Sequence, residues 1–218
     1  MDDKIFSCTD CKSRTCYLEA DGDRPVFCLT EKLDEDFVQD TVDAYSDQAS
    51  IDGRIARTAA EVEGEYYGKL TRVEETVLLV KRLGVNKVGI ASCLGLANEA
   101  AAFAEVLEVN GIDYIGVTCK VGSQDKIRMG LDEDKKVRPG RFEGMCNPML
   151  QAKVFNKERT DFNIIIGLCA GHDSIFARHS DAPVTTLIVK DRVLAHNPVA
   201  CLYGMDFYYN RLKKPLKD

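Results

Sequence analysis

Short apolar segments alternate with amphipathic segments over roughly the last two thirds of the chain. Four apolar runs have the length and β-branched content of buried strands, at residues 87–91, 114–118, 161–168 and 184–189. The segments that separate the first three runs place apolar residues at helical spacing. Fully apolar strands that alternate with helices are typical of a parallel sheet covered on both faces. The pattern therefore predicts a three-layer α/β/α domain with a mainly parallel central sheet over residues 70–218.

Helix start and stop signals support this interpretation. Thr71 and Glu74 form a capping-box pattern before an apolar stripe, and Gly84 ends that helix. Further helices are expected at about residues 96–110, 148–158 and 199–212. The segment 193–195, which follows a tight turn after the fourth strand, is predicted to form an antiparallel edge hairpin.

The first third of the chain has a different pattern. Residues 1–34 are polar and hold four cysteines, whereas residues 35–69 are polar and weakly helical. Apolar side chains recur at helical spacing from Ile51 to Val62, which favours a helix there. We therefore expect a cysteine-rich metal-binding segment at 1–34, a helical connector at 35–69, and the α/β domain at 70–218.

Composition and charge narrow the function classes. The chain has 218 residues, 45% hydrophobic and 29% charged, and its formal net charge is −6. The acidic balance argues against nucleic acid or an anionic membrane surface as a partner, and leaves a redox or protein partner open. No apolar run approaches the roughly 20 residues that cross a bilayer, and no secretory signal is visible. A cytoplasmic location is expected, and no pattern indicates an oligomeric state.

The chain contains nine cysteines, three histidines and no tryptophan. A disulfide scaffold is typical of small exported domains, and an odd count leaves one thiol over in any fully paired scheme. Metal ligation or thiol chemistry is the favoured explanation.

The first cysteine group is Cys8-x2-Cys11-x4-Cys16-x11-Cys28. Four thiolates can supply the corners of one tetrahedral metal or cluster site, and a segment this short would draw its folding energy from that metal. A redox-active thiol set and incidental cysteines are the alternatives.

The second group depends on the predicted strands. Cys93, Cys119 and Cys169 follow the first, second and third strands, whose carboxyl ends lie along one edge of a parallel sheet. Cys146 precedes the helix before the third strand and is the expected fourth ligand, because the connection from residue 120 to 144 has room to fold over that edge. Separate packing as small buried hydrophobes is the alternative.

Polar residues near this edge are candidates for proton transfer or anion binding. His172, Asp173 and Ser174 open a helix directly after Cys169, where free N–H groups favour an anion and a thiolate. An ordinary helix cap is the alternative for this trio. His196 follows the last strand as a proton donor or metal ligand, or as a structural histidine. No nucleotide-binding fingerprint occurs.

Two resemblances add to this reading. The N-terminal C-x2-C-x4-C set, the segment G-L-C-A-G-H-D-S at 167–174 and the segment 181–198 resemble an uncharacterised family, domain-of-unknown-function family 1847, described as metal-binding. The resemblance implies metal at the cysteines and supplies no reaction. The segment I-A-S-C-L-G at 90–95 is similar to the strand-end cysteine of thiouracil desulfidase-type proteins, whose strand-end cysteines hold an iron–sulfur cluster with one open iron.

The leading hypothesis is an iron–sulfur enzyme for a small anionic or sulfur-containing substrate. Its cofactor would be a 4Fe–4S cluster held by the second cysteine group, with zinc as the alternative metal. The candidate catalytic residues are Cys169, His172, Asp173 and His196. The competing hypotheses are a non-catalytic metal sensor, carrier or metallochaperone, and a zinc-stapled thiol enzyme with Cys169 as the nucleophile.

Overall fold

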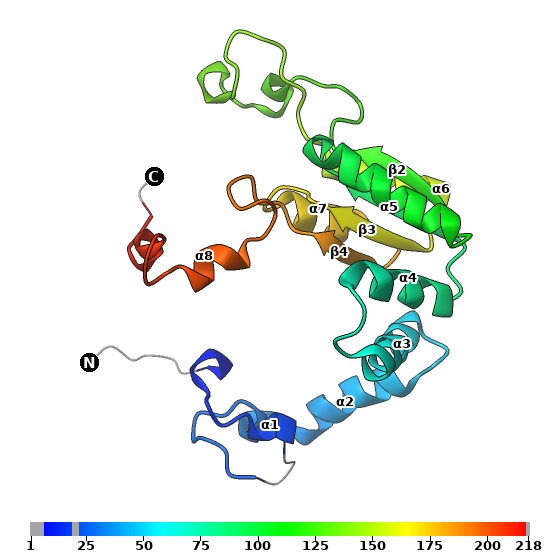
Figure 1. Ribbon diagram of the computed structural model, residues 1–218, viewed down its shortest axis with the longest axis vertical. Helices are drawn as coiled ribbons and strands as arrows, with labels where there is room; N and C mark the ends of the chain where they lie inside the picture. Colours follow the sequence, from blue (N-terminus) through cyan, green and yellow to red (C-terminus); the bar gives the residue numbers. More distant parts are fainter. Residues whose placement is uncertain (1–6, 19–21, 217–218) are drawn as a thin grey trace. The chain divides into compact units, whose positions relative to one another are not determined.

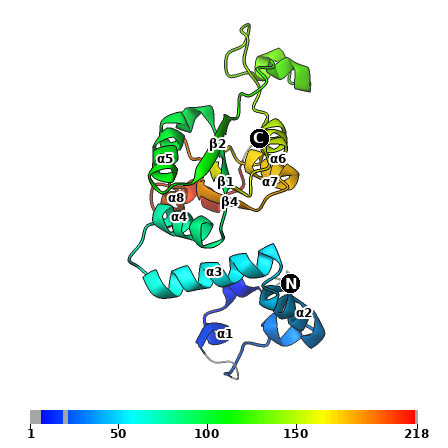
Figure 2. The ribbon, with the colours of Figure 1, turned by 90° about the vertical axis from the view of Figure 1, so that its right-hand side faces the viewer.

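The computed structural model describes residues 7–18 and 22–216. The chain divides into two compact units, Met1–Ala60 and Glu61–Asp218, and each is described by itself. Figures 1 and 2 together label the α-helices and strands of both units.

Among its described residues, the first unit contains helices joined by loops and no strand. It contains the short 3-10 helices η1 (Cys8–Asp10) and η2 (Thr30–Lys32), and the α-helices α1 (Thr15–Leu18) and α2 (Glu35–Ser46). The helix α3 (Ile51–Tyr66) runs across the division between the units. The Ser7 hydroxyl caps η1 and the Asp34 carboxylate caps α2, so each takes up an N–H group that has no partner inside its helix.

The second unit is built on four parallel strands in the order β2-β1-β3-β4. The strands are β1 (Lys87–Ser92), β2 (Asp113–Thr118), β3 (Phe162–Ile166) and β4 (Val184–Ile188). The helices are α4 (Arg72–Arg82), α5 (Ala97–Val109), α6 (Pro148–Glu158) and α7 (His172–His179). Figure 2 shows α4 and α5 on one face of the sheet and α6 and α7 on the other. The predicted α/β/α fold is therefore confirmed.

The core explains why the sequence folds in this way. Ile90 and Ile164 are almost fully buried, and the ring of Phe155 on α6 meets that of Phe176 on α7 edge-to-face, with 5.8 Å between the ring centroids. At Gly89 the side chain of Asn163 on β3 lies so close that a Cβ atom would be 2.1 Å from its Oδ1 atom. The centre of β1 therefore accepts no side chain at that position.

The chain after β4 differs from the sequence prediction. The expected edge hairpin at 193–195 is wrong, because the Asp191 carboxylate accepts the backbone N–H groups of Val193 and Leu194 and holds them in a turn. Ala195 and His196 then adopt left-handed backbone conformations, with φ of 49° and 63°, which no strand contains.

The last predicted helix is shorter than expected. The helix α8 (Val199–Tyr203) ends at Gly204, and only the 3-10 helix η6 (Asn210–Lys213) follows. Glycine is a poor helix former, and the amide of Tyr209 returns to the Gly204 carbonyl as a turn. None of the described helices has the length and apolar character needed to span a membrane.

Candidate functional site

The carboxyl ends of β1 and β2 place two cysteines side by side. Ser92 is in register with Thr118, and the ladder continues one residue further, because the Cys119 N–H donates to the Ser92 carbonyl at 2.8 Å. The Cys93 N–H donates to the Ile166 carbonyl of β3 at 3.1 Å. Cys93 and Cys119 are both buried at the edge that the sequence predicts.

Cys169 reaches the same edge from β3. Gly167 has a φ of 65° and turns the chain just after that strand, and its N–H still donates to Ile188 at the end of β4 at 2.8 Å. Cys169 lies two residues beyond this turn and is half-buried.

Cys146 comes to this edge from the long connection after β2. The amide of Asn147 donates to the Cys119 carbonyl at 2.7 Å, and that of Met145 donates to Gln124 at 2.7 Å, which pins the segment on both sides of Cys146. The side chains of Cys93 and Cys146 have the largest effects on the ionisation of the Cys119 thiol, so both lie near it. Three of the four predicted thiols therefore form a chain with Cys119 in the middle.

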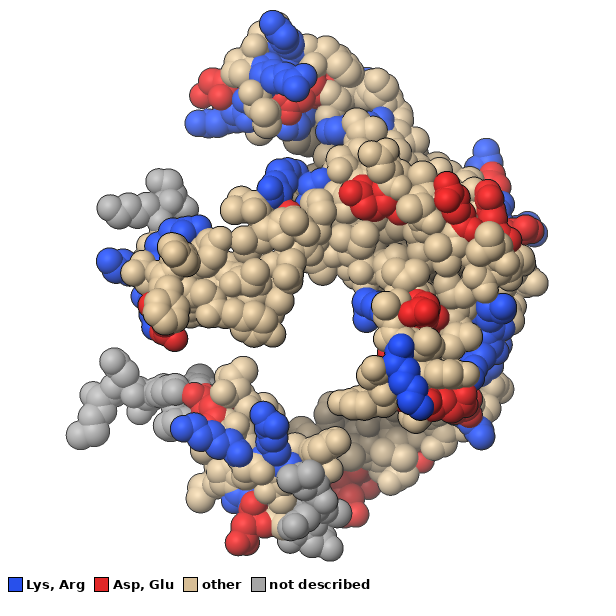
Figure 3. All heavy atoms as spheres, in the orientation of Figure 1, with Lys and Arg blue, Asp and Glu red and all other residues tan. Residues whose placement is uncertain are grey.

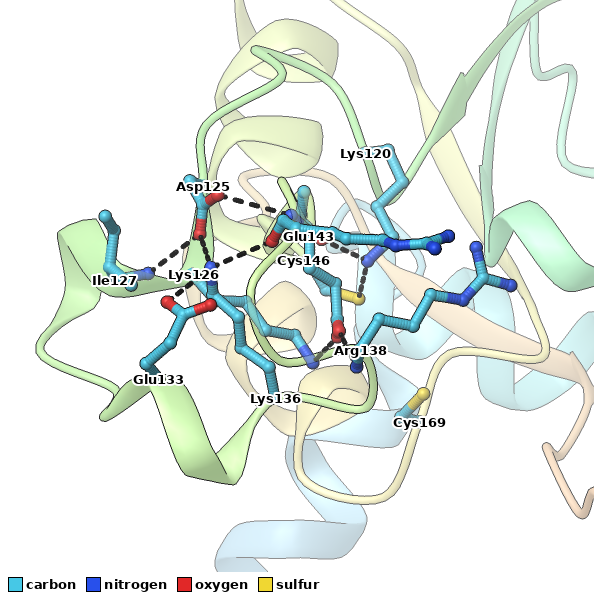
Figure 4. A network of polar contacts seen from close by, with 12 residues as sticks. Lys120, Asp125, Lys126, Ile127, Glu133, Lys136, Arg138, Glu143, Cys146 and Cys169 are labelled. Atoms are coloured by element: carbon cyan, nitrogen blue, oxygen red, sulfur yellow. Dashed lines mark hydrogen bonds and ion pairs between the residues drawn. The ribbon is translucent and has the colours of Figure 1, made fainter.

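Three cations lie against the outer thiols. The Nζ atom of Lys190 is 3.0 Å from the sulfur of Cys93, and an Nη atom of Arg192 is 2.9 Å from that of Cys169. Lys120 points at Cys146, with its Nζ atom 3.3 Å from the sulfur, as Figure 4 shows. Each cation belongs to the residues just after β2 or β4.

The contacts divide the thiols by charge. The hydrogen bond from Cys119, with help from Lys190 and against the effect of burial, lowers the pKa of Cys93 to about 4. The contact with Cys119, together with Lys120 and the nearby His172, lowers the pKa of Cys146 to about 5. The same two contacts and burial raise the pKa of Cys119 far above its ordinary value. At neutral pH a protonated thiol therefore lies between two thiolates.

Gln151 holds the carboxyl ends of β1 and β2 together from α6. It is fully buried on α6, and its side-chain NH₂ donates to the carbonyls of Ser92 at 3.1 Å and Val117 at 2.7 Å. It thus ties together the two strand ends that carry Cys93 and Cys119. Its Oε1 atom is buried and has no hydrogen-bond partner among the described residues.

The connection that carries Cys146 is folded by ion pairs. The side chain of Lys136 is only 2% exposed, and its Nζ atom lies 2.9 Å from carboxylates of both Asp125 and Glu133. Lys126 pairs with Glu143 beside them, and Figure 4 shows the network close to Lys120 and Cys146. Basic and acidic side chains crowd this lobe in Figure 3. The segment is therefore an ordered arm, with the short 3-10 helices η4 (Lys126–Met129) and η5 (Glu133–Lys135).

The other predicted polar residues have varied positions. His172 lies close enough to influence the Cys146 thiol, whereas Asp173 accepts the Ser174 N–H at 2.9 Å within the first turn of α7. The Nδ1 atom of His196 accepts the Asp191 N–H at 3.2 Å. His196 lines a separate groove beside β4, of about 510 Å³, together with Arg72. This geometry gives His196 a structural hydrogen bond in the turn after β4.

The N-terminal cysteines surround a cavity of their own. Cys8, Cys11, Cys16 and Cys28 all line one pocket of about 250 Å³ in the first unit. The Ser13 hydroxyl and the N–H groups of Ser13 and Arg14 lower the pKa of Cys11. Burial opposes ionisation of Cys28, but the hydroxyl and N–H of Thr30 outweigh it and lower the pKa of Cys28.

Neither the N-terminal cysteines nor the edge cysteines have the arrangement of a metal-binding site in this structure. Within residues 7–18 and 22–216, no three His, Cys, Asp or Glu side chains are arranged so that they could hold a metal ion. Any metal bound at either place would have to draw the thiols together from these positions.

Sequence reasoning missed the cations and Gln151. Lys120 directly follows Cys119, and Lys190 and Arg192 follow the fourth strand. These three could have been placed at the same edge as the cysteines, because the carboxyl ends of parallel strands share one edge. Gln151 lies on a helix, and no signal in the sequence marks it.

Comparison with known proteins places this architecture in a family. The family model described as a protein of unknown function, DUF1847, matches residues 28–187, which include all four edge cysteines and Cys28. The uncharacterized protein MJ0455 of Methanocaldococcus jannaschii is 38% identical over 216 residues, covering 97% of this chain and 99% of that protein. No solved structure gives a significant match. The chain therefore belongs to the DUF1847 family.

Proposed function

We propose that Cys93, Cys119, Cys146 and Cys169 hold an iron–sulfur cluster, of the 4Fe–4S type, at the carboxyl edge of the sheet. The observation that carries the proposal is that the chain brings cysteines from three strand ends and one arm to one edge of the sheet, with Cys119 near two of the others. Four soft sulfur donors suit iron–sulfur clusters, and zinc is the alternative metal.

The surroundings of the thiols favour metal binding. Thiolates are the form that binds metal, and two of the four are already ionised at neutral pH. Basic groups against the sulfurs offset the negative charge that a thiolate-ligated cluster carries. The similarity of residues 90–95 to thiouracil desulfidase-type proteins points to the same cofactor.

We propose further that the protein is an enzyme for a small anionic or sulfur-containing substrate. A cluster with four cysteine ligands would supply redox chemistry when it is bound. Among the proposed ligands that follow β1, β2 and β3, Cys169 is the most accessible, so a substrate would approach the cluster on its side. His172, near Cys146, is the candidate group for proton transfer.

A second candidate function rests on the N-terminal cysteines. All four of them line one cavity, which favours a separate metal centre in the first unit. A metal sensor, carrier or metallochaperone would need this centre and no reaction at the sheet edge.

The test is the metal content of protein purified without oxygen. A cluster-bearing protein is brown, with broad visible absorption and with iron and acid-labile sulfide in similar amounts. The double variant Cys93→Ser/Cys119→Ser should lose the iron of the edge site, whereas Cys201→Ser, in α8 and hydrogen-bonded to the Pro198 carbonyl, should keep it. A colourless wild-type protein that contains zinc would reject the iron–sulfur proposal, and a metal-free one would reject both metals.

A further inference from the structure

We propose that residues 137–142 of the arm, which we call the docking loop, bind an acidic electron-carrier protein. This inference rests on the proposed function, because such a carrier has a role only if the edge cysteines hold a redox-active cluster. The carrier would pass one electron to the cluster, so that the carrier is oxidised and the cluster is reduced, while no bond forms or breaks. The inference names a surface and the chemical class of its partner.

The docking loop exposes apolar and basic side chains together. All of its residues are exposed, and its two ends are the large apolar side chains of Val137, which is 80% exposed, and Phe142, which is 63% exposed. Arg138 and Arg141 lie between them. Arginine and aromatic residues are enriched in protein–protein interfaces. None of these four side chains is buried in the fold, so packing within the chain does not account for them.

The backbone of the docking loop is nevertheless fixed from below. The N–H groups of Arg138 and Gly140 donate to the carboxylates of Glu143 at 2.9 Å and Glu133 at 2.6 Å. The buried Lys136 donates to a carbonyl of the loop at 3.1 Å. Gly140 has a φ of 76°, a left-handed conformation that glycine adopts at little cost. The loop is therefore pre-organised, and a partner would bind it without first having to order its backbone.

The charge of the docking loop favours an acidic partner. Arg138 and Arg141 form no ion pair with Asp or Glu in the described part of the chain. The carboxylates that hold the loop pair with Lys126 and Lys136 instead. The loop thus presents two uncompensated positive charges on a protein whose formal net charge is −6. An acidic protein is attracted to this loop and repelled by most of the remaining surface, which would orient its approach.

The position of the docking loop suits electron transfer. The loop ends four residues before Cys146, on the same arm. Figure 4 shows the Arg138 side chain on the side of the arm that faces Cys146 and Cys169. Electron transfer between two centres slows steeply as their separation grows. A carrier bound at the loop would therefore approach the cluster from the side of these two proposed ligands.

The experiment measures how fast a reduced acidic ferredoxin reduces the cluster of protein purified without oxygen. Stopped-flow absorption gives the second-order rate constant at low and high salt. We expect this rate constant to fall as salt rises, and Arg138→Gln/Arg141→Gln to lower it roughly fivefold or more at low salt, because opposite charges speed association and salt screens them. Val137→Ser/Phe142→Ser keeps the charge and should also lower it, because apolar contact with the carrier is lost.

Two controls separate docking from other effects. Lys157→Gln/Arg178→Gln removes the same charge from the last turns of α6 and α7, at the opposite edge of the sheet from the cysteines, and should leave the rate constant nearly unchanged. Reduced methyl viologen is a small cation that needs no docking surface. It should reduce the cluster of both loop variants as fast as that of the wild type.

The outcomes separate the two proposals. Protein that contains no iron overturns the proposed function and this inference together. Iron-loaded protein overturns the inference alone if ferredoxin does not reduce it, if the rate constant is independent of salt, or if the loop variants react with ferredoxin as fast as the wild type. Loop variants that are slowed equally with methyl viologen also overturn it, because the loop would then act on the cluster and not on a partner.

Discussion

At the scale of single residues, the edge cysteines differ in the pKa of their thiols, although the sequence predicts the same role of metal ligand for each of them. Cys93 and Cys146 each lie against a lysine, whereas Cys119 lies between them and accepts the Leu94 N–H at 3.4 Å. Cys119 provides the strongest contact to both neighbours, so it lowers their pKa values while its own pKa rises. One buried thiol thus keeps two others ionised.

This arrangement predicts how metal-free protein reacts with iodoacetamide. Only the thiolate reacts, so Cys146, with its pKa lowered to about 5, should reach its full alkylation rate by about pH 7 and lose it as the pH falls through 5. An ordinary cysteine, with a pKa of about 8.5, would still be gaining rate at pH 8. Mass spectrometry of the Cys146 peptide across this pH range gives the midpoint.

Two lysine variants give this measurement its control. Lys120→Gln should raise the midpoint, because it removes a cation that lowers the pKa of Cys146, and Lys153→Gln on α6 should leave it unchanged. A wild-type midpoint near that of an ordinary cysteine would contradict the predicted charge pattern.

Gly89 gives a second prediction at this scale. A Cβ atom there would overlap the Asn163 Oδ1 and come within 2.7 Å of the Phe155 ring, so Gly89→Ala should lower the free energy of unfolding by about 1–3 kcal/mol. The control is Gly64→Ala, at an exposed position of α3 with nothing within 4 Å of an added Cβ atom, which should raise the free energy of unfolding by about 0.5–1 kcal/mol. Urea denaturation measures both, and an unchanged stability in Gly89→Ala would refute the close contact.

At the scale of elements, the sequence predicts correctly those helices and strands that depend on local apolar periodicity and helix caps. The strands and the helices α4, α5 and α6 follow from apolar periodicity and caps, and the capping box at Thr71 is formed as expected. The segment after β4 could not be predicted, because its fold depends on one carboxylate, that of Asp191, which competes with a strand for two backbone N–H groups.

The arm that carries Cys146 could not be predicted from local pattern either. Its apolar residues have no regular spacing, and its order comes from ion pairs around a buried lysine. From sequence alone, a charged residue in a loop is expected to be solvated, so the buried Lys136 could not be recognised. The strand-end cysteines could be placed because parallel topology alone brings them to one edge.

The arm gives a prediction at the element scale. Lys136→Met should leave the Asp125 and Glu133 carboxylates facing each other without their shared cation, and thereby loosen residues 122–144. Hydrogen exchange should speed up in that segment and stay slow in β1 and β3. Lys135→Met is the control, since Lys135 is 67% exposed and its ion pair at 3.6 Å contributes little. Equal protection of the arm in both variants would show that the ion pairs do not order it.

At the scale of the whole molecule, the chain keeps two cysteine groups in two structural units. The cavity lined by Cys8, Cys11, Cys16 and Cys28 lies in the first unit, and the edge cysteines lie in the second. The family model begins at Cys28, so it covers the edge group completely and only the last residue of the N-terminal group. The two groups share no residue, and each has its own thiolate-favouring neighbours.

This separation predicts that the two groups bind metal independently. Cys8→Ser/Cys11→Ser should remove the metal of the first unit and make that unit easier to digest with protease, because a segment with no core of its own depends on the metal for stability. Cys93→Ser/Cys119→Ser should remove the metal of the second unit and leave the first unchanged. Metal analysis of anaerobically prepared protein should then find that the losses add, and that the quadruple variant is metal-free. If either double variant loses all of the metal, the groups depend on one another and the independent-centre model is wrong; if Cys8→Ser/Cys11→Ser keeps its full metal content and protease resistance, the N-terminal cysteines are not ligands.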